Sequence, residues 1–477
     1  MDVRPELTGA VLDIAQATVN FPQYDGLDSL KDYTKLYPNN WENILPDGPD
    51  AGAETNFTQD LFFSMERLSS SPYQVRRLNP SSDSVAFQVD DATAKTITGS
   101  TLQSLFSSGR LFYADYRDQK GFSPTNHYGA ACDAYFYIDS SSGDFLPLAI
   151  RTNVGANLVY TRQDTANNWL LAKIMLNVND FWFAQWNHLA QTHEVVQIAY
   201  MAAIALFALG TVVDQIFPFT GSSAQDYTTD YYKNKGSGRF QPNYFETELE
   251  ARGLINSNVG PALKNFPFYE DASTIHDAIE GFMTTFVKSY YPTNRAISSD
   301  EELQAWVTEA QGPAEAIDFP STTSTTDLID VLTHFAHLAS TSHHTVNTNE
   351  LLDISSTLPF HPPALYKPVP TRKGVKNVAS FLPPFVSVLD QFVVGALFAR
   401  PKFAGSQRAL LHMFDDPTML DRMNPKTKAA AAKFQQQMQA FSSQVSAKTF
   451  DADGLSQGMP FVWRALDPNV APYSITT

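Results

Sequence analysis

The stretch NDFWFAQWNHLAQTHE, residues 179–194, decides the fold, and it lies inside a long apolar segment from Trp169 to Val213. This segment contains no Pro and a single Gly, so it predicts one long helix or two stacked helices. His188 and His193 are five residues apart, which on an ideal α-helix separates them by about 140° of arc. A π-bulge would bring both side chains to one face, whereas a regular helix would bury one and expose the other. The spacing alone leaves both interpretations open.

A second histidine-rich stretch is TSHHTVNTNE, residues 341–350. His343 and Asn347 are four residues apart, so on a helix they lie about 40° from each other and can reach one point. A neutral imidazole with an amide oxygen is a plausible donor pair for iron or manganese. The neighbouring His334, His337 and His344 fall on other faces, and we expect each of them to be structural.

Composition limits the kinds of site that this chain can build. Its 477 residues carry 33 Lys and Arg against 50 Asp and Glu, a formal net charge of −17, which disfavours nucleic-acid binding. With Cys132 as the single cysteine, an internal disulfide and a cysteine-based metal site are excluded. Any metal must therefore be held by His, carboxylate, amide or backbone groups, and the ten His become the residues of interest.

The remaining patterns predict a mainly helical chain with a smaller, partly β portion near the N-terminus. Length alone suggests about three domains, but the Pro-rich stretches of the last third do not separate it. Strands are expected between residues 85 and 150, where aromatic and polar residues alternate in VAFQVDD, GRLFYADY and DAYFYIDSSSGDFLPLAI. Further helices are expected at Leu61–Leu68, Ala272–Tyr291, Glu301–Ala310, Asp327–Ser340 and Lys426–Lys448.

Rival motifs and targeting signals are weak. Glu194 follows His193 as in the H-E-x-x-H zinc signature, but Gln197 stands where the second His belongs. The longest apolar run, Ile198 to Val213, is short for a membrane span and favours a buried core helix. No signal peptide is visible at the N-terminus, so we expect a soluble protein and leave the compartment open between cytoplasm and secretion.

Several short sequence motifs resemble motifs of lipoxygenases and occur in the same order along the chain. WLLAK (169–173) leads into His188-x4-His193, and His343-x3-Asn347 precedes LPFHPP (358–363) and KPVPT (367–371). The other matching words are GRLFYADY (109–116), FLPLAI (145–150), GTVVDQIFP (210–218), ELEARGL (248–254), NFPFY (265–269), SYY (289–291) and DEELQAW (300–306). The resemblance covers roughly residues 60–477 and is similar to fungal and bacterial members, without the N-terminal β-barrel lipid-binding domain. It implies one catalytic domain over 1–477, with an N-terminal portion at 1–110 and a metal-binding helical core at 111–477.

The resemblance also implies a set of site residues. The metal ligands would be His188, His193, His343, Asn347 and the C-terminal carboxylate at Thr477, although the family ends in Ile or Val. Glu350 stands where relatives usually have a polar residue such as Gln, and would either tune the ligands or be solvated. The segment 194–251 is shorter than in the family, and the small residue that governs stereochemistry falls near Ala208 or Gly210. A bulky clamp over the substrate would lie near Leu397 or Phe398, and the arginines considered for the fatty-acid carboxylate are Arg151, Arg162 and Arg400.

The activity implied is that of a non-haem metal dioxygenase, with one Fe or Mn ion. It would convert a polyunsaturated fatty acid such as linoleate, plus O2, into a hydroperoxide by abstraction of a bis-allylic hydrogen. Two alternatives stay open because the wall near Ala208 is altered: a hydroperoxide isomerase that forms epoxyalcohols, and a degenerate, non-catalytic lipid-binding member. We expect a monomer that binds no nucleic acid, and leave peripheral membrane contact open.

Overall fold

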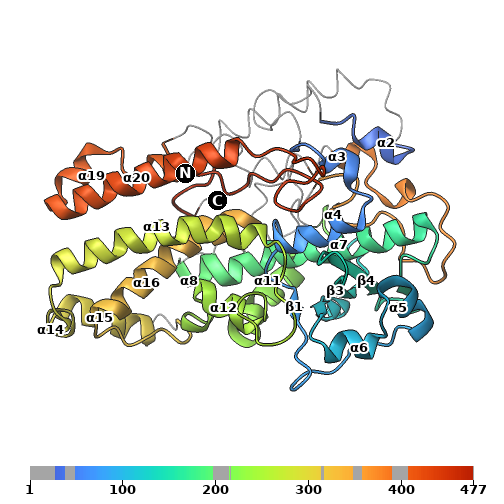
Figure 1. Cartoon of the computed structure of the whole chain (residues 1–477), viewed down its shortest axis with the longest axis horizontal. Helices are drawn as coiled ribbons and strands as arrows, with labels where there is room; N and C mark the ends of the chain where they lie inside the picture. The colour runs from blue at the N-terminus through green and yellow to red at the C-terminus, as the bar shows by residue number, and fades with distance from the viewer. Residues whose placement is uncertain are drawn as a thin grey trace.

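The computed structural model describes residues 27–37, 49–196, 214, 216–312, 316–346, 357–388, 391 and 407–475. In this part of the chain, an antiparallel sheet lies beside a larger helical body (Figure 1). The sheet has the strand order β1-β2-β3-β4-β5. Its strands are β1 Arg76–Arg77, β2 Leu111–Asp115, β3 Asp133–Ile138, β4 Phe145–Arg151 and β5 Val159–Tyr160.

The sheet separates two apolar clusters because successive side chains point to opposite faces. On one face, Leu111, Tyr113 and Tyr135 pack with two short helices, α5 (Asp91–Thr98) and α6 (Leu102–Ser107). On the other face, Phe112 and Phe136, which are paired in register, join the main core. The sheet therefore supports the helical body from one side.

The strands expected in GRLFYADY and DAYFYIDSSSGDFLPLAI are confirmed, but the strand expected in VAFQVDD is wrong. Residues 85–90 belong to no strand, and Asp91 begins α5. The alternation there comes from packing, because the Phe87 ring stacks on the Tyr135 ring with centroids 4.2 Å apart. The Tyr135 hydroxyl also accepts from the Phe87 amide at 2.8 Å and donates to its carbonyl at 3.0 Å. The hydroxyl of Tyr135 thus satisfies the two backbone groups of Phe87 that a neighbouring strand would otherwise bond.

Helices make up most of the rest. The α-helices besides α5 and α6 are α2 Leu30–Tyr33, α3 Ala53–Asn56, α4 Asp60–Met65, α7 Ala166–His188, α8 Glu194–Val196, α11 Gly221–Asp230, α12 Phe245–Ala251, α13 Pro267–Tyr290, α14 Asn294–Ser298, α15 Glu301–Gln311, α16 Thr325–His337, α17 His343–Val346, α19 Pro417–Asp421 and α20 Pro425–Ser446. Within the described ranges, three segments are π-helical: η3 Leu189–His193, η5 Tyr231–Lys235 and η7 Leu338–Ser342. Short 3-10 turns are η1 Glu66–Leu68, η2 Arg117–Gly121, η6 Gln241–Asn243, η10 Ala379–Phe381 and η12 Leu410–His412. The mainly α fold class is confirmed.

Local signals set several of these helix boundaries. Helix α16 begins with a capping box, in which Ser324 and Asp327 each bond the other's backbone amide. Helix α20 begins with Pro425 at its first position, while the Asn424 side chain accepts from the Thr427 amide. Helices α13, α16 and α20 pack together on one side of the molecule (Figure 1).

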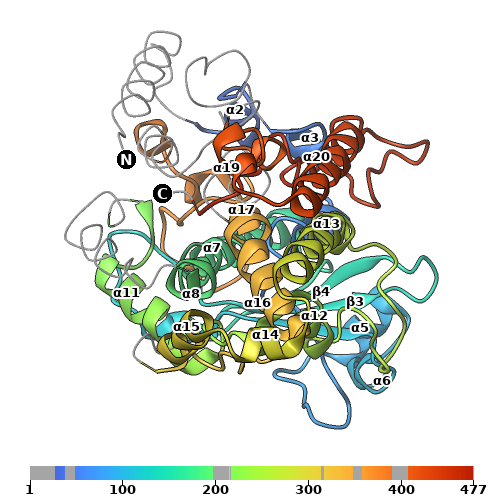
Figure 2. The ribbon, with the colours of Figure 1, turned by 90° about the vertical axis from the view of Figure 1, so that its left-hand side faces the viewer.

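Helix α7 forms the centre of the body and is buried on all sides from Asn168 to His188. It contacts α11, α17, β4 and β5, and Figure 2 shows α7 between α11 and α17. The described part of the segment from Trp169 to Val213 is therefore helical, as predicted, and it is buried. The apolar run at 198–213 lies outside the described residues; among those described, every helix is too short or too polar to cross a bilayer.

Candidate metal centre

The end of α7 widens into the π-helical segment η3, which spans the five residues from Leu189 to His193. There the amide of Glu194 bonds the carbonyl of Leu189, five residues earlier, instead of the fourth. The wider turn brings His188 and His193 onto one face, with ring centroids 5.4 Å apart. Of the two interpretations that the spacing left open, the structure has the π-bulge.

The second histidine stretch has the same construction. Helix α16 runs into η7, and the amide of His343 bonds the carbonyl of Leu338, again five residues earlier. Short helix α17 begins at His343, and contacts between η3 and η7 and between α7 and α17 hold the two segments against each other. Two π segments therefore present their histidines to one shared space.

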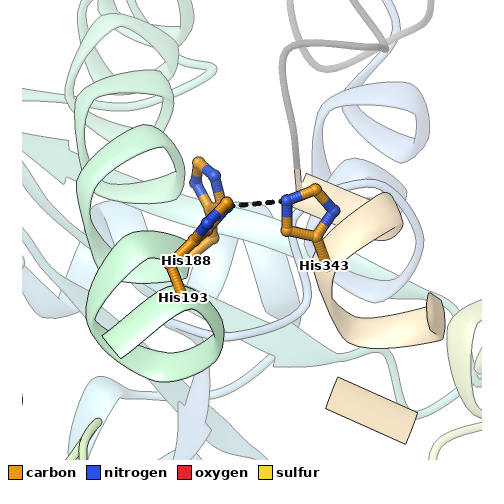
Figure 3. A group of neighbouring side chains, drawn as sticks. All are labelled: His188, His193 and His343. Carbon is orange, nitrogen blue, oxygen red and sulfur yellow. Dashed lines mark hydrogen bonds between the residues drawn. The ribbon is translucent and has the colours of Figure 1, made fainter. Parts of the chain in front are cut away.

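Three imidazoles converge there (Figure 3). One ring nitrogen each of His188, His193 and His343 lies within 4.8 Å of the others. The Nε2 atoms of His193 and His343 are 2.8 Å apart, and the His188 ring centroid is 5.4 Å from that of His343. All three side chains are buried.

Burial keeps these histidines neutral. It lowers the pKa of His188 to about 4, and it lowers the pKa values of His193 and His343 well below the usual range. His188 Nδ1 donates to the carbonyl of Ala184 at 3.0 Å, which leaves Nε2 with the free lone pair. Neutral imidazole is the form that binds a metal ion.

The distances fit a metal ion. Two nitrogens bound at right angles to a first-row metal at about 2.1 Å lie about 3 Å apart, close to the 2.8 Å between His193 and His343. Cys132 is buried and burial raises its pKa well above the usual range, so it supplies no thiolate. The donors among the described residues are therefore imidazole nitrogens without a thiolate, which iron and manganese both accept.

Most of the other predicted site residues lie outside the described residues. Asn347 directly follows Val346, the last residue of α17, but its own position is outside, as are those of Glu350, Thr477, Ala208, Gly210, Leu397, Phe398 and Arg400. The tail is placed as far as Ile475, which is buried. It is held by backbone bonds from Leu410 to Ala471 at 2.7 Å and from Tyr473 to Arg408 at 3.1 Å. Tyr473 also lines a cavity of about 30 Å³ together with Ser340 of η7, so the tail lies beside the second π segment.

Two of the arginines considered for the carboxylate have other partners. Arg151 makes a two-pronged bond to Asp133, at 2.9 Å and 2.7 Å, and covers the Phe87 ring. Arg162 donates to the carbonyl of Ile97 at 2.5 Å. Both therefore serve the sheet region, and the carboxylate anchor stays unassigned.

A cavity of about 330 Å³ borders the end of α7 at Asn187 and the π segment η3 at Gln191. Its walls also carry Lys235, Arg239 and Arg252. Phe183 and Tyr231 line it as well, so charged and aromatic side chains share its walls.

A buried polar network that sequence reasoning missed lies along α7. Arg67, whose side chain has no exposed surface, bonds Glu66 at 2.7 Å and pairs with Asp180 at 3.2 Å. Asp180 also accepts from Ser71 at 2.9 Å and from the Tyr116 hydroxyl. The network ties the helix that carries His188 to η1. The signal for it was Asp180 itself, a carboxylate in a long segment rich in apolar residues.

We expect Arg67→Met to destabilise the fold strongly. The change leaves two buried carboxylates without their cation, which costs about 3–5 kcal/mol. Denaturant unfolding measures this loss. The control is Arg239→Met, which breaks an exposed pair with Asp318 and should cost less than about 1 kcal/mol. Equal losses in both variants would contradict the assigned role of the network.

His334 and His337 are structural, as the sequence predicted. The His334 ring lies 4.7 Å from the Phe240 ring and 5.0 Å from the Tyr244 ring, and the His337 ring lies 4.6 Å from the Phe245 ring. Burial lowers the pKa of His334 to about 3. His334 is thus neutral in the fold down to well below pH 6.5.

We expect His334→Phe to make the metal-free protein more resistant to acid. Between pH 6.5 and about 3 the unfolded chain protonates this histidine and the fold does not, so stability falls as pH drops. At pH 5 this costs about 2 kcal/mol. Unfolding free energies of both proteins at pH 5 and pH 8 measure the effect, because any packing change is the same at both. An unchanged pH dependence would contradict the assignment.

Comparisons with known proteins agree on one family. The lipoxygenase family model matches residues 194–452. The manganese lipoxygenase of Colletotrichum gloeosporioides is 44% identical over 486 residues, covering 95% of this chain and 80% of the relative. That of Fusarium oxysporum is 41% identical over 508 residues, covering 100% and 83%. A solved structure of a manganese lipoxygenase superposes with a TM-score of 0.93 at 38% identity, covering 99% of this chain and 89% of the other.

Proposed function

Because this chain belongs to the lipoxygenase family, we propose that His188, His193 and His343 hold the metal of its active site and that this metal is manganese. The enzyme is an oxidoreductase, a dioxygenase that acts on a polyunsaturated fatty acid and O2. The observation that carries the ligand proposal is the convergence of three buried, neutral imidazoles. The manganese assignment is supported by the names of the relatives.

The proposed ligand set is completed by Asn347 and the carboxylate of Thr477. Asn347 follows Val346, the last described residue of α17, and is four residues after His343 in the sequence. The tail supports the carboxylate, because Ile475 is buried and Tyr473 lies beside η7. Glu350 is proposed to tune these ligands, since it follows Asn347 by three residues.

The bound metal supplies one-electron oxidation of the fatty acid, and the chain supplies the surroundings for it. Three imidazoles and an amide add no charge, so one carboxylate leaves the ion electron-poor. Trp186 and Leu189 are buried beside His188 in the chain, on α7 and η3, and help to keep bulk water out. We propose that Ala208, Gly210, Leu397 and Phe398 line the acyl channel.

We propose one catalytic domain over residues 1–477, with the helical core at 111–477. The pairing of β1 with β2 joins the parts before and after residue 110. We further propose that the protein acts as a monomer, with peripheral membrane contact as the route to its lipid, and that it binds no nucleic acid, in keeping with its net charge of −17.

Elemental analysis of the purified protein, combined with electron paramagnetic resonance, tests the proposed site. We expect one manganese per chain and a bound Mn(II) spectrum. Stoichiometric iron would contradict the choice of metal, and absence of any bound metal after manganese loading would contradict the ligand set.

A further inference from the structure

The two π segments share a feature that neither the ligand proposal nor the fold requires: short hydroxyl bonds to backbone carbonyls. The Thr192 hydroxyl donates to the carbonyl of His188 at 2.5 Å. In η7, the Ser340 hydroxyl donates to the carbonyl of Ala336 at 2.6 Å. In α17, the Thr345 hydroxyl donates to the carbonyl of Thr341 at 2.7 Å. All three side chains are buried.

The hydroxyl bond of Thr192 lies between the two converging histidines. Its acceptor belongs to His188, the first of the two converging histidines, and the donor directly precedes His193, the second. In a regular α-helix this carbonyl would accept the amide of Thr192, four residues later. Within the widened turn, the side-chain hydroxyl of Thr192 donates to this carbonyl of His188.

The competing conformation is a regular α-helix. Without the bulge, the helix would place His188 and His193 about 140° apart and only one could face the metal. A π turn is rare because its backbone bonding is less favourable, so it needs local support. Serine and threonine hydroxyls that bond the fourth preceding carbonyl are known to bend and perturb helices. Thr192 places that perturbation between the two histidines.

A second element supports the same turn from outside. The Thr228 hydroxyl of α11 donates to the carbonyl of Trp186 at 3.3 Å, which also receives the Leu189 amide at the start of η3. Two threonine hydroxyls thus bond carbonyls at the entrance to the turn.

We propose that Thr192 is a positioning residue for the metal site, whose hydroxyl holds the π turn that brings His188 and His193 to one ion. This inference rests on the ligand set proposed above. Thr192 touches neither metal nor substrate in this role and acts only through the backbone of His188.

The test compares Thr192→Val, which keeps the shape and removes the hydroxyl, with Thr192→Ser, which keeps the hydroxyl. Manganese affinity is measured by chelator competition, and the resonance spectrum of bound Mn(II) reports ligand geometry. We expect at least tenfold weaker binding and a changed spectrum for Val, as for other residues that orient metal ligands, and affinity within twofold of the parent for Ser.

The matched control is Thr98→Val. Thr98 is also buried, and its hydroxyl bonds the carbonyl of Ala94 at 2.9 Å at the end of the α-helix α5. It also bonds the backbone of Ser100, so its loss gives an upper limit for the general effect of removing such a hydroxyl far from the metal site. We expect its manganese affinity to be unchanged. Val at 192 binding as tightly as the parent, or Ser binding as weakly as Val, would overturn the proposal.

Two further results separate this inference from the ligand proposal. A parent chain that binds no manganese would overturn the ligand set and the premise with it, whereas tight binding by both parent and Thr192→Val overturns the role of Thr192 alone. If Thr192→Val does not fold, Thr192→Ala, which also lacks the hydroxyl, is compared with Thr192→Ser, and weaker binding is expected for Ala only. Unchanged affinity for Thr192→Ala would then overturn the proposal.

Discussion

The variant His343→Ala is expected to lose stoichiometric manganese and to reduce formation of conjugated diene from linoleate by at least about a thousandfold. Its imidazole is the single described donor from the second helix, and its Nε2 lies 2.8 Å from that of His193. Removing it opens one side of the site, and metal binding and catalysis are lost together. Metal content and ultraviolet absorbance of the product measure the two effects.

The matched control for this prediction is His344→Ala, at the next position of the same helix. His344 is equally buried, and burial lowers its pKa to about 4, but it bonds the backbone of Ala465 instead of facing the other histidines. We expect this variant to keep its manganese. Stoichiometric manganese in His343→Ala, or equal loss in both variants, would show that the ligand assignment is wrong.

Extending the chain by two residues beyond Thr477 is expected to abolish activity as completely. Two extended residues move the terminal carboxylate by about 7 Å, too far to reach the ion from the anchored tail. Thr477→Ile is the control, because it changes the side chain and keeps the main-chain carboxylate in place. We expect near-parental metal content and diene formation for Thr477→Ile and loss of both for the extended chain. If the extended chain is active, the terminal carboxylate is not a metal ligand.

The helices around the site could be predicted because their signals are local. The apolar segment from Trp169 to Val213 predicted a long helix, and α7 is its described part. The helix expected from Asp327 is α16, which begins at Thr325 because Ser324 and Asp327 cap it. The strand expected at VAFQVDD failed for the converse reason. Its alternation reflects contact with Tyr135, 48 residues away, which no local pattern contains.

The metal site also combines features that the local sequence predicted with features that depend on distant contacts. The five-residue spacing of His188 and His193 permitted a shared face but could not decide it, because the choice depends on the hydroxyl of Thr192 and on Thr228 of a later helix. The resemblance to lipoxygenases implied that both histidines are metal ligands and therefore share one face. The pairing of Arg67 with Asp180 joins residues more than a hundred positions apart, so burial along α7 had to be known before that partner could be named.

The central claim is that this chain is a metal-dependent fatty-acid dioxygenase, and one measurement tests it most directly. Manganese-loaded and metal-free protein are each mixed with linoleate while O2 uptake and conjugated-diene absorbance are followed together. We expect the loaded protein to form one diene for each O2 consumed and the metal-free protein to form none. Conversion of an added hydroperoxide without O2 uptake would identify an isomerase instead, and bound manganese with no turnover of either substrate would contradict catalysis altogether.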